Sequence, residues 1–373
     1  MTKKSVGIII NPIAGIGGRV GLKGSDGEET LEKALSLGGK PESAARTKRA
    51  LDGLAPIKDE LDVYTYGGDM GETLLSSAGF LTKIVGRADK EKTSADDTIK
   101  AAKAMREAGV DLILFAGGDG TARNIYEAVG TDVPVIGIPA GVKIHSAVYA
   151  TNPENAGVVA RDYLEGQIDT LEESEVMDID EDLFRQGIVR AKLYGYMTVP
   201  VSGGRLQRMK DGSGDEDDRG GMAAHIVDRM KDDVLYIIGP GSTTRSIMED
   251  MELPNTLLGV DVVKNRQLVA ADVTEAELWE LLSDPKQKAV IVVTIIGGQG
   301  YLFGRGNQQI SPRIIRRVGI DNIIVASTPT KLVGLLGKPL LVDTGDAELD
   351  QELNGYVEVV LGYGHTSIYS VAN

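Results

Sequence analysis

The sequence predicts an α/β protein of two domains, a Rossmann-like parallel-sheet domain followed by a mixed α/β domain that is rich in strands. Three observations predict this fold class. The chain has 373 residues, more than a single hydrophobic core usually serves. Short apolar runs alternate with helical patterns. Glycine accounts for 47 residues, well above the roughly 7% of average proteins, and it clusters directly after the apolar runs.

Four apolar runs in the first half are each followed by a glycine-rich loop. The runs and loops are 6–10 before NPIAGIGG, 63–66 before GGDMG, 112–115 before GGDGT and 135–138 before PAG. Continuous apolar runs of this length are typical of buried parallel strands. In open α/β sheets the loops at the carboxyl ends of such strands hold ligands, so these four loops are candidate binding loops.

A helical pattern lies between the second and third runs. Apolar residues keep a helical spacing over 94–108, Ser94 or Thr93 can cap the start, and Gly109 can end the helix. Strands and helices alternate in this way to about residue 150. We therefore place the first domain at 1–165 and the second at 166–373, with the active site in the crevice between them.

The second half begins with an acidic segment at 171–183 and a predicted strand in LYGYMTVPVSGG. A polar excursion over 203–221 is predicted to be a mobile surface loop, because it lacks the Gly and Glu positions of an EF-hand. The elements expected after it are a strand at 234–238, a helix ending at 248, a hairpin around 264–266, a helix at 275–282, a strand at 290–296, a long loop at 297–312, and strands at 322–326, 340–342, 356–361 and 366–371. The last strands either close the second sheet or return to the first.

Charge and composition exclude several classes of protein. Forty Lys and Arg against 55 Asp and Glu give a net charge of −15, which disfavours nucleic acid as a partner. No cysteine is present, so disulfides, thiolate metal sites and thiol nucleophiles are excluded. Three histidines are too few for a convincing zinc site. No apolar run approaches the roughly 20 residues of a membrane helix, and the expected location is the cytoplasm.

The GGDGT loop at 117–121 is the strongest candidate for chemistry. Its three glycines allow backbone amides to approach a phosphate, and a helix predicted from about Ala122 adds its positive end. A carboxylate in such a cradle is unusual. Asp119 is either a general base toward an attacking hydroxyl or a helix cap that tightens the turn.

The stretch LILFAGGDGTARN, followed by VPVIGIPAGVK, resembles the signature of the NAD kinase superfamily, which includes diacylglycerol and sphingosine kinases. NPIAGIGGR and GGDMGE resemble its opening Asn-Pro loop and its second-strand loop. IIGPGSTTRS resembles the Thr-Pro-Thr-Gly-Ser-Thr-Ala segment of NAD kinases. Together with GNQQISP, the whole chain resembles the ATP- or polyphosphate-dependent NAD kinase branch related to acetoin-catabolism X proteins.

This resemblance implies a Mg²⁺-dependent phosphotransferase that moves a phosphoryl group from ATP or polyphosphate to the 2′-hydroxyl of NAD, giving NADP. The first domain would bind nucleotide and Asp119 would accept the hydroxyl proton. The implied cofactor-binding residues are Asn11, Gly15, Gly17, Gly18, Arg19, Gly117, Gly118, Gly120, Thr121, Lys143, Gly241, Ser242 and Thr243. No metal ligand is assigned. The superfamily also implies a homo-oligomer, with small nucleotides as the only other partners and no membrane.

The sequence departs from NAD kinases in lacking a clear Asn-Glu pair for the nicotinamide-ribose or adenine side. Three functions therefore stay open: an NAD kinase, a related kinase of another small alcohol or a lipid, and a noncatalytic nucleotide-binding module. A lipid acceptor would need an exposed apolar or basic amphipathic surface, which this acidic chain does not show.

Several side chains keep two interpretations. Arg19 either binds phosphate or is a surface charge, and Arg245 either favours an anionic acceptor or pairs with Glu249. His145 follows PAG and is either a ligand contact or structural. In the late loop, three donor side chains either read an acceptor or satisfy loop carbonyls: Arg305, Asn307 and Gln308. His225 and His365 are expected to be structural.

Overall fold

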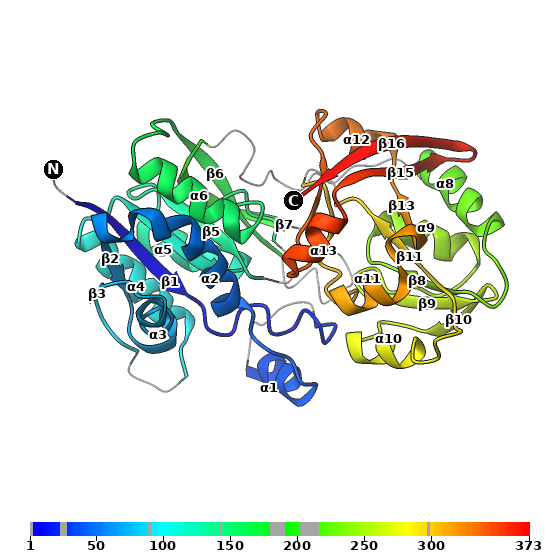
Figure 1. The fold of residues 1–373 in the computed structure, drawn as a ribbon, viewed down its shortest axis with the longest axis horizontal. Coiled ribbons are helices and arrows are strands. Elements are labelled where there is room, and N and C mark those ends of the chain that lie inside the picture. Colours follow the sequence, from blue (N-terminus) through cyan, green and yellow to red (C-terminus); the bar gives the residue numbers. More distant parts are fainter. Residues whose placement is uncertain are drawn as a thin grey trace. The chain divides into compact units, whose positions relative to one another are not determined.

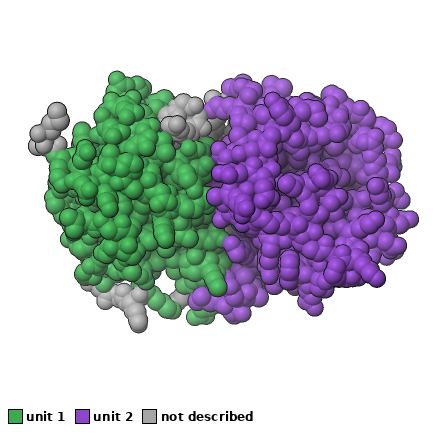
Figure 2. Space-filling view, viewed as in Figure 1, with its two compact units in different colours: residues 1–16, 24–32, 40–209 green, residues 17–23, 33–39, 210–373 purple. Residues whose placement is uncertain are grey.

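The computed structural model describes residues 3–22, 28–88, 92–141, 144–179, 191–201, 216–296 and 299–373. The chain divides into two compact units (Figure 2). Unit 1 comprises Met1–Ile16, Gly24–Glu32 and Lys40–Met209, and unit 2 comprises Gly17–Lys23, Lys33–Gly39 and Lys210–Asn373. Each unit has its own sheet and its own cores, as the fold class predicted.

Unit 1 is built on a five-stranded parallel sheet in the order β3-β2-β1-β4-β5 (Figure 1). Its strands are β1 (Lys4–Ile10), β2 (Leu61–Thr65), β3 (Thr82–Ile84), β4 (Leu112–Gly117) and β5 (Val135–Pro139). The four predicted strands of this half are confirmed. β1 pairs with β2 on one side and with β4 on the other, so the strand order reverses between β1 and β4. This switch point is where open α/β sheets bind ligands.

Helices cover both faces of this sheet because the strands are apolar on both faces. Val6, Ile8 and Ile10 pack with α2 (Ser43–Leu54) and α6 (Pro153–Leu164), whereas Ile9 packs with α4 (Ala95–Glu107) and α5 (Asp119–Val129) on the other face (Figure 1). The smaller helical segments are α1 (Glu28–Ser36), α3 (Glu72–Ser77), and the 3-10 turns η1 (Ala55–Glu60) and η2 (Gly68–Met70). The layers therefore place the strand ends, and the loops that leave them, at one edge of a rigid core.

The predicted helix over 94–108 is confirmed as α4. Ser94 and Asp97 form a reciprocal capping box at its start. Gly109, which follows its end, has φ +71°, a conformation that a side chain disfavours.

An antiparallel pair completes unit 1. The strands β6 (Leu171–Ile179) and β7 (Ala191–Pro200) pair with each other, and Val176, Met197 and Val199 join the core that contains α4 and α5. The acidic segment of the sequence is therefore largely a strand. Glu172 and Glu173 are exposed whereas Ser174 and Val176 are buried, which suits a sheet with one solvated face.

Unit 2 is built on a nine-stranded mixed sheet in the order β10-β9-β8-β11-β13-β15-β16-β14-β12. Its strands are β8 (Leu235–Ile238), β9 (Asp261–Lys264), β10 (Gln267–Ala270), β11 (Ala289–Thr294), β12 (Tyr301–Phe303), β13 (Ile323–Ala326), β14 (Leu340–Val342), β15 (Gly355–Gly362) and β16 (His365–Ala372). The last strands close the second sheet, which settles the placement that the sequence left open. β8, β11 and β13 run parallel, so their carboxyl ends share one edge.

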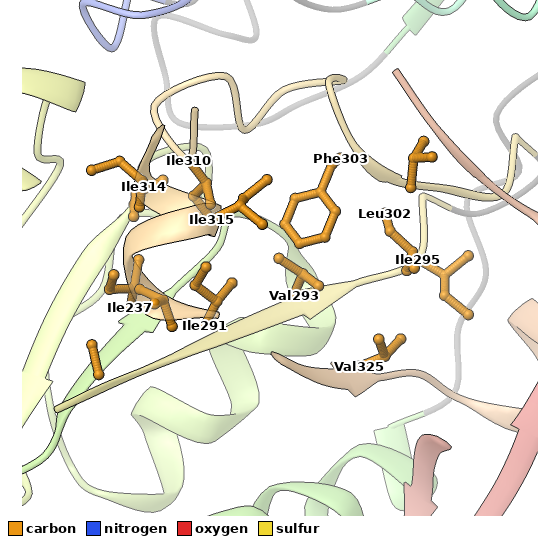
Figure 3. Close-up of a cluster of buried hydrophobic side chains, with 14 of the residues drawn as sticks. Ile237, Ile291, Val293, Ile295, Leu302, Phe303, Ile310, Ile314, Ile315 and Val325 are labelled. Atoms are coloured by element: carbon orange, nitrogen blue, oxygen red, sulfur yellow. The ribbon is translucent and has the colours of Figure 1, made fainter. Parts of the chain in front are cut away.

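The helices of unit 2 pack on both faces of its sheet. They are α8 (Glu216–Asp228), α9 (Ser242–Asp250), α10 (Glu275–Leu281), α11 (Pro312–Val318), α12 (Pro329–Gly334) and α13 (Ala347–Glu352), with the turn η3 (Ile320–Asn322). Figure 3 shows one core, where Ile314 and Ile315 of α11 lie over Ile291 and Val293 of β11. Met222 and Ile226 of α8 belong to the other core.

Two predicted loops contain regular structure. The predicted surface loop over 203–221 ends in the first residues of α8, which begins at Glu216; positions 202–215 lie outside the described residues. Acidic residues suit the first turn of a helix as well as they suit a loop, so composition could not separate the two. The loop predicted at 297–312 contains the short strand β12. No described helix has the length and apolarity to cross a membrane.

Candidate functional site

The GGDGT loop joins β4 to α5 at the switch point of the unit 1 sheet. Gly118 is the residue before the helix, and the helix starts at Asp119, three residues earlier than predicted. The first backbone N–H groups of an α-helix have no partner within the helix, and here they belong to Asp119, Gly120 and Thr121. α5 has 11 residues, so its N-terminus carries the partial positive charge that attracts phosphate.

Two glycines let the GGDGT loop and the PAG loop approach backbone to backbone. A Cβ on Gly118 would lie 3.1 Å from the Cα of Gly141, and a Cβ on Gly141 would lie 2.6 Å from the Cα of Gly118. Ala140 and Gly141 both donate backbone hydrogen bonds to the carbonyl of Gly117, at 2.9 Å each. The loops after β4 and β5 are therefore held as one unit, and side chains are excluded where they meet.

The loop after β1 is tied to the same place. The Nδ2 of Asn11 donates to the Oγ1 of Thr121 at 3.0 Å, and the backbone N–H of Asn11 donates to Ala116 at 3.0 Å. Gly15 has φ +84°, and a Cβ there would meet the carbonyl oxygen of Ala140 at 2.6 Å. The structure thus brings Asn11 to the GGDGT loop and Gly15 to the PAG loop.

Asp119 does not cap its own helix. The carboxylate points to residues 145–146, which leave the loop after β5. Oδ2 accepts from the backbone N–H of His145 at 2.7 Å and lies 2.9 Å from the His145 Nδ1. Oδ1 accepts from the backbone N–H and the hydroxyl of Ser146, at 3.0 and 2.7 Å. Asp119 is 5% exposed, so this is a buried charged group with a dense shell of donors.

A buried tyrosine, Tyr149, holds the backbone of the GGDGT loop. The hydroxyl of Tyr149 donates to the carbonyl of Gly118 at 2.6 Å, and its ring packs edge-on against Phe115. The ring lies over Gly137 of β5, where a Cβ would come within 2.3 Å of it. A strand residue without a side chain is therefore what gives Tyr149 room to reach the GGDGT loop.

Unit 2 has its own group of polar side chains at the carboxyl ends of β8 and β11. Gly241 precedes α9 with φ +131°, Ser242 begins the helix, and Thr243 is buried. The Nζ of Lys331, from α12, donates to the Oγ1 of Thr243 at 2.8 Å and to the carbonyl of Ile295 at 3.2 Å. An ammonium group therefore lies beside the predicted Gly-Ser-Thr segment.

The sequence matches the family model of the ATP-NAD kinase N-terminal domain over residues 6–168 and that of the ATP-NAD kinase C-terminal domain over residues 231–371. The chain belongs to the ATP-NAD kinase family. This places it in the NAD kinase and diacylglycerol kinase-like superfamily that its loops resemble. A search of the curated proteins gives no match.

Among solved structures, this ATP-NAD kinase family member is similar to a putative diacylglycerol kinase from Bacillus anthracis str. Sterne. One such structure is 16% identical, with a TM-score of 0.26, and the match covers 48% of this chain and 47% of that chain. A second, also described as a putative diacylglycerol kinase from that strain, is 17% identical with a TM-score of 0.25, covering 48% and 46%. This chain thus spans about half the length of the solved structures it matches.

The remaining residues predicted for the family site fall into two groups. Gly17, Gly18 and Arg19 belong to unit 2, where a Cβ on Gly18 would meet Gln308 and the carbonyl of Arg19 accepts from the backbone of Glu275. The side chain of Arg19 is exposed. Lys143 lies outside the described residues.

The structure gives contacts for the side chains that the sequence left with two interpretations. Arg245 is exposed and its Nε donates to Glu249 at 2.7 Å. Asn307 donates to the carbonyl of Leu302 and accepts from the backbone of Gly304, so it satisfies its own loop. Arg305 is buried beside Asp343, with 3.3 Å between Nη2 and Oδ2.

In the second-strand loop GGDMGE, Glu72 forms an ion pair with Arg87. The Arg87 guanidinium donates to both carboxylate oxygens of Glu72 at 2.6 Å and lowers the pKa of Glu72 below its usual value. Asp69, which stands where Asp119 stands in GGDGT, is exposed. The two similar motifs therefore have different environments.

Sequence reasoning missed three partners of the predicted residues: Ser146, Tyr149 and Lys331. None of them lies in a recognisable motif, and Lys331 is 88 positions from Thr243. His145 was identified only as one of two alternatives. The position of His145 and Ser146 directly after the PAG loop is the one signal that could have pointed to the Asp119 carboxylate.

Proposed function

We propose that this chain is a phosphotransferase that moves the terminal phosphoryl group of ATP, or of polyphosphate, to an alcohol, with the 2′-hydroxyl of NAD as the first acceptor to test. The observation that carries this proposal is the buried Asp119 carboxylate at the N-terminus of α5, held at the switch point of the unit 1 sheet. Membership of the ATP-NAD kinase family supports the same chemistry.

In this proposal the donor phosphates bind to the N-terminus of α5. Gly118 and Gly120 carry no side chain at this helix end, and Asn11 donates a hydrogen bond to the Thr121 hydroxyl. Phosphoryl transfer asks a protein mainly for positioning and for stabilisation of charge. Backbone N–H groups at a helix end provide both, because they are fixed by the helix before the substrate arrives.

In this proposal a polar segment of unit 2 also contributes to ligand binding. Gly241, Ser242 and Thr243 begin α9, and the Lys331 ammonium adds positive charge next to Thr243. Hydroxyl and backbone donors of this kind suit the polar groups of a soluble ligand such as a nucleotide.

Magnesium fits this site as part of the donor. Among the described residues, no three His, Asp or Glu side chains are grouped so as to hold a metal ion. The carboxylate oxygens of Asp119 are already occupied by His145 and Ser146. Because Mg²⁺ commonly binds substrate phosphates and keeps several waters, we propose that it enters with ATP as its complex. The charge of the phosphates is then reduced beside the carboxylate.

The test is transfer of radiolabelled phosphate from ATP or polyphosphate to NAD in the presence of Mg²⁺. The native chain is expected to form labelled NADP, and Asp119→Asn is expected to lose at least about 10²-fold in kcat. Asp69→Asn in GGDMG serves as the matched control. If the native chain consumes the phosphoryl donor without forming NADP, NAD is not the acceptor, and other small alcohols are then screened. If the native chain transfers no phosphate at all, the proposed function is contradicted.

A further inference from the structure

We infer that His145, held by Asp119, is the group that takes the proton from the acceptor hydroxyl. The inference rests on the proposed phosphotransferase function and specifies how its proton leaves. Asp119 is then a positioning and charge-stabilising residue, and the reactive atom is the Nε2 of the imidazole.

The hydrogen bonds of Asp119 leave little room for a direct role. An ionised carboxylate has about four lone-pair positions. Oδ2 faces two nitrogens of His145, and Oδ1 faces the nitrogen and the hydroxyl of Ser146. An acceptor hydroxyl could form a hydrogen bond to Asp119 only after one of these four partners is displaced.

The Ser146 hydroxyl also contacts the backbone of Met177, and this second contact shows where its proton points. Its oxygen accepts from the backbone N–H of Met177 at 3.0 Å and also lies 2.8 Å from the carbonyl of Met177. The single hydroxyl proton is drawn to Asp119 Oδ1, at 2.7 Å, because a hydrogen bond to an ionised oxygen is stronger than one to a carbonyl. All four partners of Asp119 are therefore donors.

The same geometry fixes the tautomer of His145. Its Nδ1 lies 2.9 Å from a carboxylate oxygen, so the neutral ring carries its proton on Nδ1. The backbone N–H of His145 binds the same oxygen and limits rotation of the ring. Nε2 then presents its lone pair, and it has no hydrogen bond to any residue that the structure describes.

An imidazole next to a buried carboxylate is a competent base. The side chains of His145 and Asp119 are 7% and 5% exposed, so little water screens their interaction. When Nε2 accepts a proton, the positive charge forms directly beside the carboxylate that holds Nδ1. This is the division of roles that general-base catalysis uses when a carboxylate orients a histidine.

The other two histidines do not share this arrangement. His225 is buried, but its Nδ1 accepts from the backbone N–H of Gly364 at 2.8 Å, which requires the lone pair on Nδ1. His365 is exposed in β16. Of the three histidines in the chain, His145 is the one whose Nδ1 faces a carboxylate.

The chemical step balances with the reactants of the proposed function. Nε2 takes the hydrogen of the acceptor hydroxyl, and the freed oxygen forms a bond to the γ-phosphorus of ATP. The bond from that phosphorus to the bridging oxygen breaks, and its electron pair leaves with ADP. The imidazolium later returns its proton to solvent, so the net products are the phosphorylated acceptor, ADP and one proton.

The first experiment replaces His145 with glutamine, whose amide can still donate to Asp119 but cannot accept a proton. We expect kcat with NAD to fall about 10²–10⁴-fold while KM for ATP changes less than threefold. His365→Gln is the matched control and keeps native activity. Partial recovery of a His145→Ala variant by added imidazole would further support the role of the ring.

The outcomes separate this inference from the proposed function. A native chain that makes NADP together with a His145→Gln variant within threefold of it overturns the inference and leaves the function standing, with Asp119 as the direct base. A native chain that transfers phosphate to no acceptor overturns both.

A second measurement uses the native chain, so its result does not depend on whether a variant folds. Nitrogen NMR of the native chain labelled at histidine shows only three imidazoles. His145 is expected to carry its proton on Nδ1. A His145 ring protonated on Nε2 would have no lone pair to offer and would overturn the inference.

Discussion

The Oδ2 atom of Asp119 lies 2.7 Å from the backbone nitrogen and 2.9 Å from the ring Nδ1 of His145, a residue 26 positions later in the chain. One carboxylate oxygen thereby fixes both the backbone and the ring of the histidine. The contact exists because β4 and β5 are neighbours and end at the same edge of the sheet. This pairing of strands determines the surroundings of the Asp119 carboxylate.

We expect Asp119→Asn to be less stable than the native chain as well as less active. The asparagine amide group would face two of the N–H or O–H donors of residues 145–146, and these buried donors would lose their acceptor. An unsatisfied buried donor costs about 1–3 kcal/mol. Thermal unfolding should show a lower Tm for this variant, whereas Asp69→Asn, on an exposed residue, should unfold like the native chain. An unchanged Tm for Asp119→Asn would contradict the hydrogen-bond pattern described here.

The hydrogen bond between Asn11 and Thr121 should be measurable as a coupling between two loops. Asn11→Ala and Thr121→Val each remove it, and the double variant cannot remove it twice. A double-mutant cycle of unfolding free energies should give a coupling of about 0.5–1.5 kcal/mol. Additive effects would show that the two side chains are not joined.

Gly118 and Gly141 should tolerate alanine to different degrees. A Cβ on Gly141 meets the opposite backbone at 2.6 Å, which requires a shift, while a Cβ on Gly118 meets it at 3.1 Å. We expect Gly141→Ala to lower the Tm more than Gly118→Ala. Gly220 lies in the helix α8, where an added Cβ would have no atom within 4 Å, so Gly220→Ala should stabilise by about 0.5–1 kcal/mol. The reverse order of the two loop variants would contradict the close approach.

A surface ion pair in unit 2 predicts that the stability of the folded chain decreases at low pH. The Arg316 guanidinium and the backbone N–H of Leu349 lower the pKa of Asp346 to about 2 from an ordinary value of 3.8. Because the folded state has the lower pKa, the stabilisation is complete above about pH 4 and is lost as pH falls toward 2. Asp346→Asn keeps an N-cap for α13 but loses the charge, so it should be less stable than the native chain at pH 7 by under about 1 kcal/mol. The difference in Tm should shrink between pH 4 and pH 3, and a constant difference would contradict the assignment.

The sequence was sufficient for β1, β2, β4 and β5 because each is an apolar run followed by a glycine-rich loop, whereas β3 has no such run and was not predicted. It also identified the helix boundary at Gly109 and the hairpin around 264–266, where Asn265 and Arg266 have positive φ and connect β9 to β10. These features depend on neighbours in the chain, so local patterns determine them.

The sequence could not give the partners of the predicted residues. Asp119 was recognised by its motif, but the choice between a cap and a catalytic role depended on contacts with residues 145–146 across two strands. Gly118 was recognised as a glycine of a phosphate loop, yet its closest constraint is the backbone of Gly141. Lys331 has no motif at all, and only the parallel order of β8, β11 and β13 brings it to Thr243. Such contacts arise from strand order, which a local pattern does not encode.

The contact between Gly137 and Tyr149 has a consequence for how this chain can change by mutation. A methyl group at position 137 would lie 2.3 Å from the tyrosine ring, so a larger residue there is compatible only with a smaller one at 149. That smaller residue would lack the hydroxyl that holds the carbonyl of Gly118. Position 137 can therefore gain a side chain only together with a smaller residue at 149, and that double replacement removes the hydrogen bond to the loop that carries Asp119.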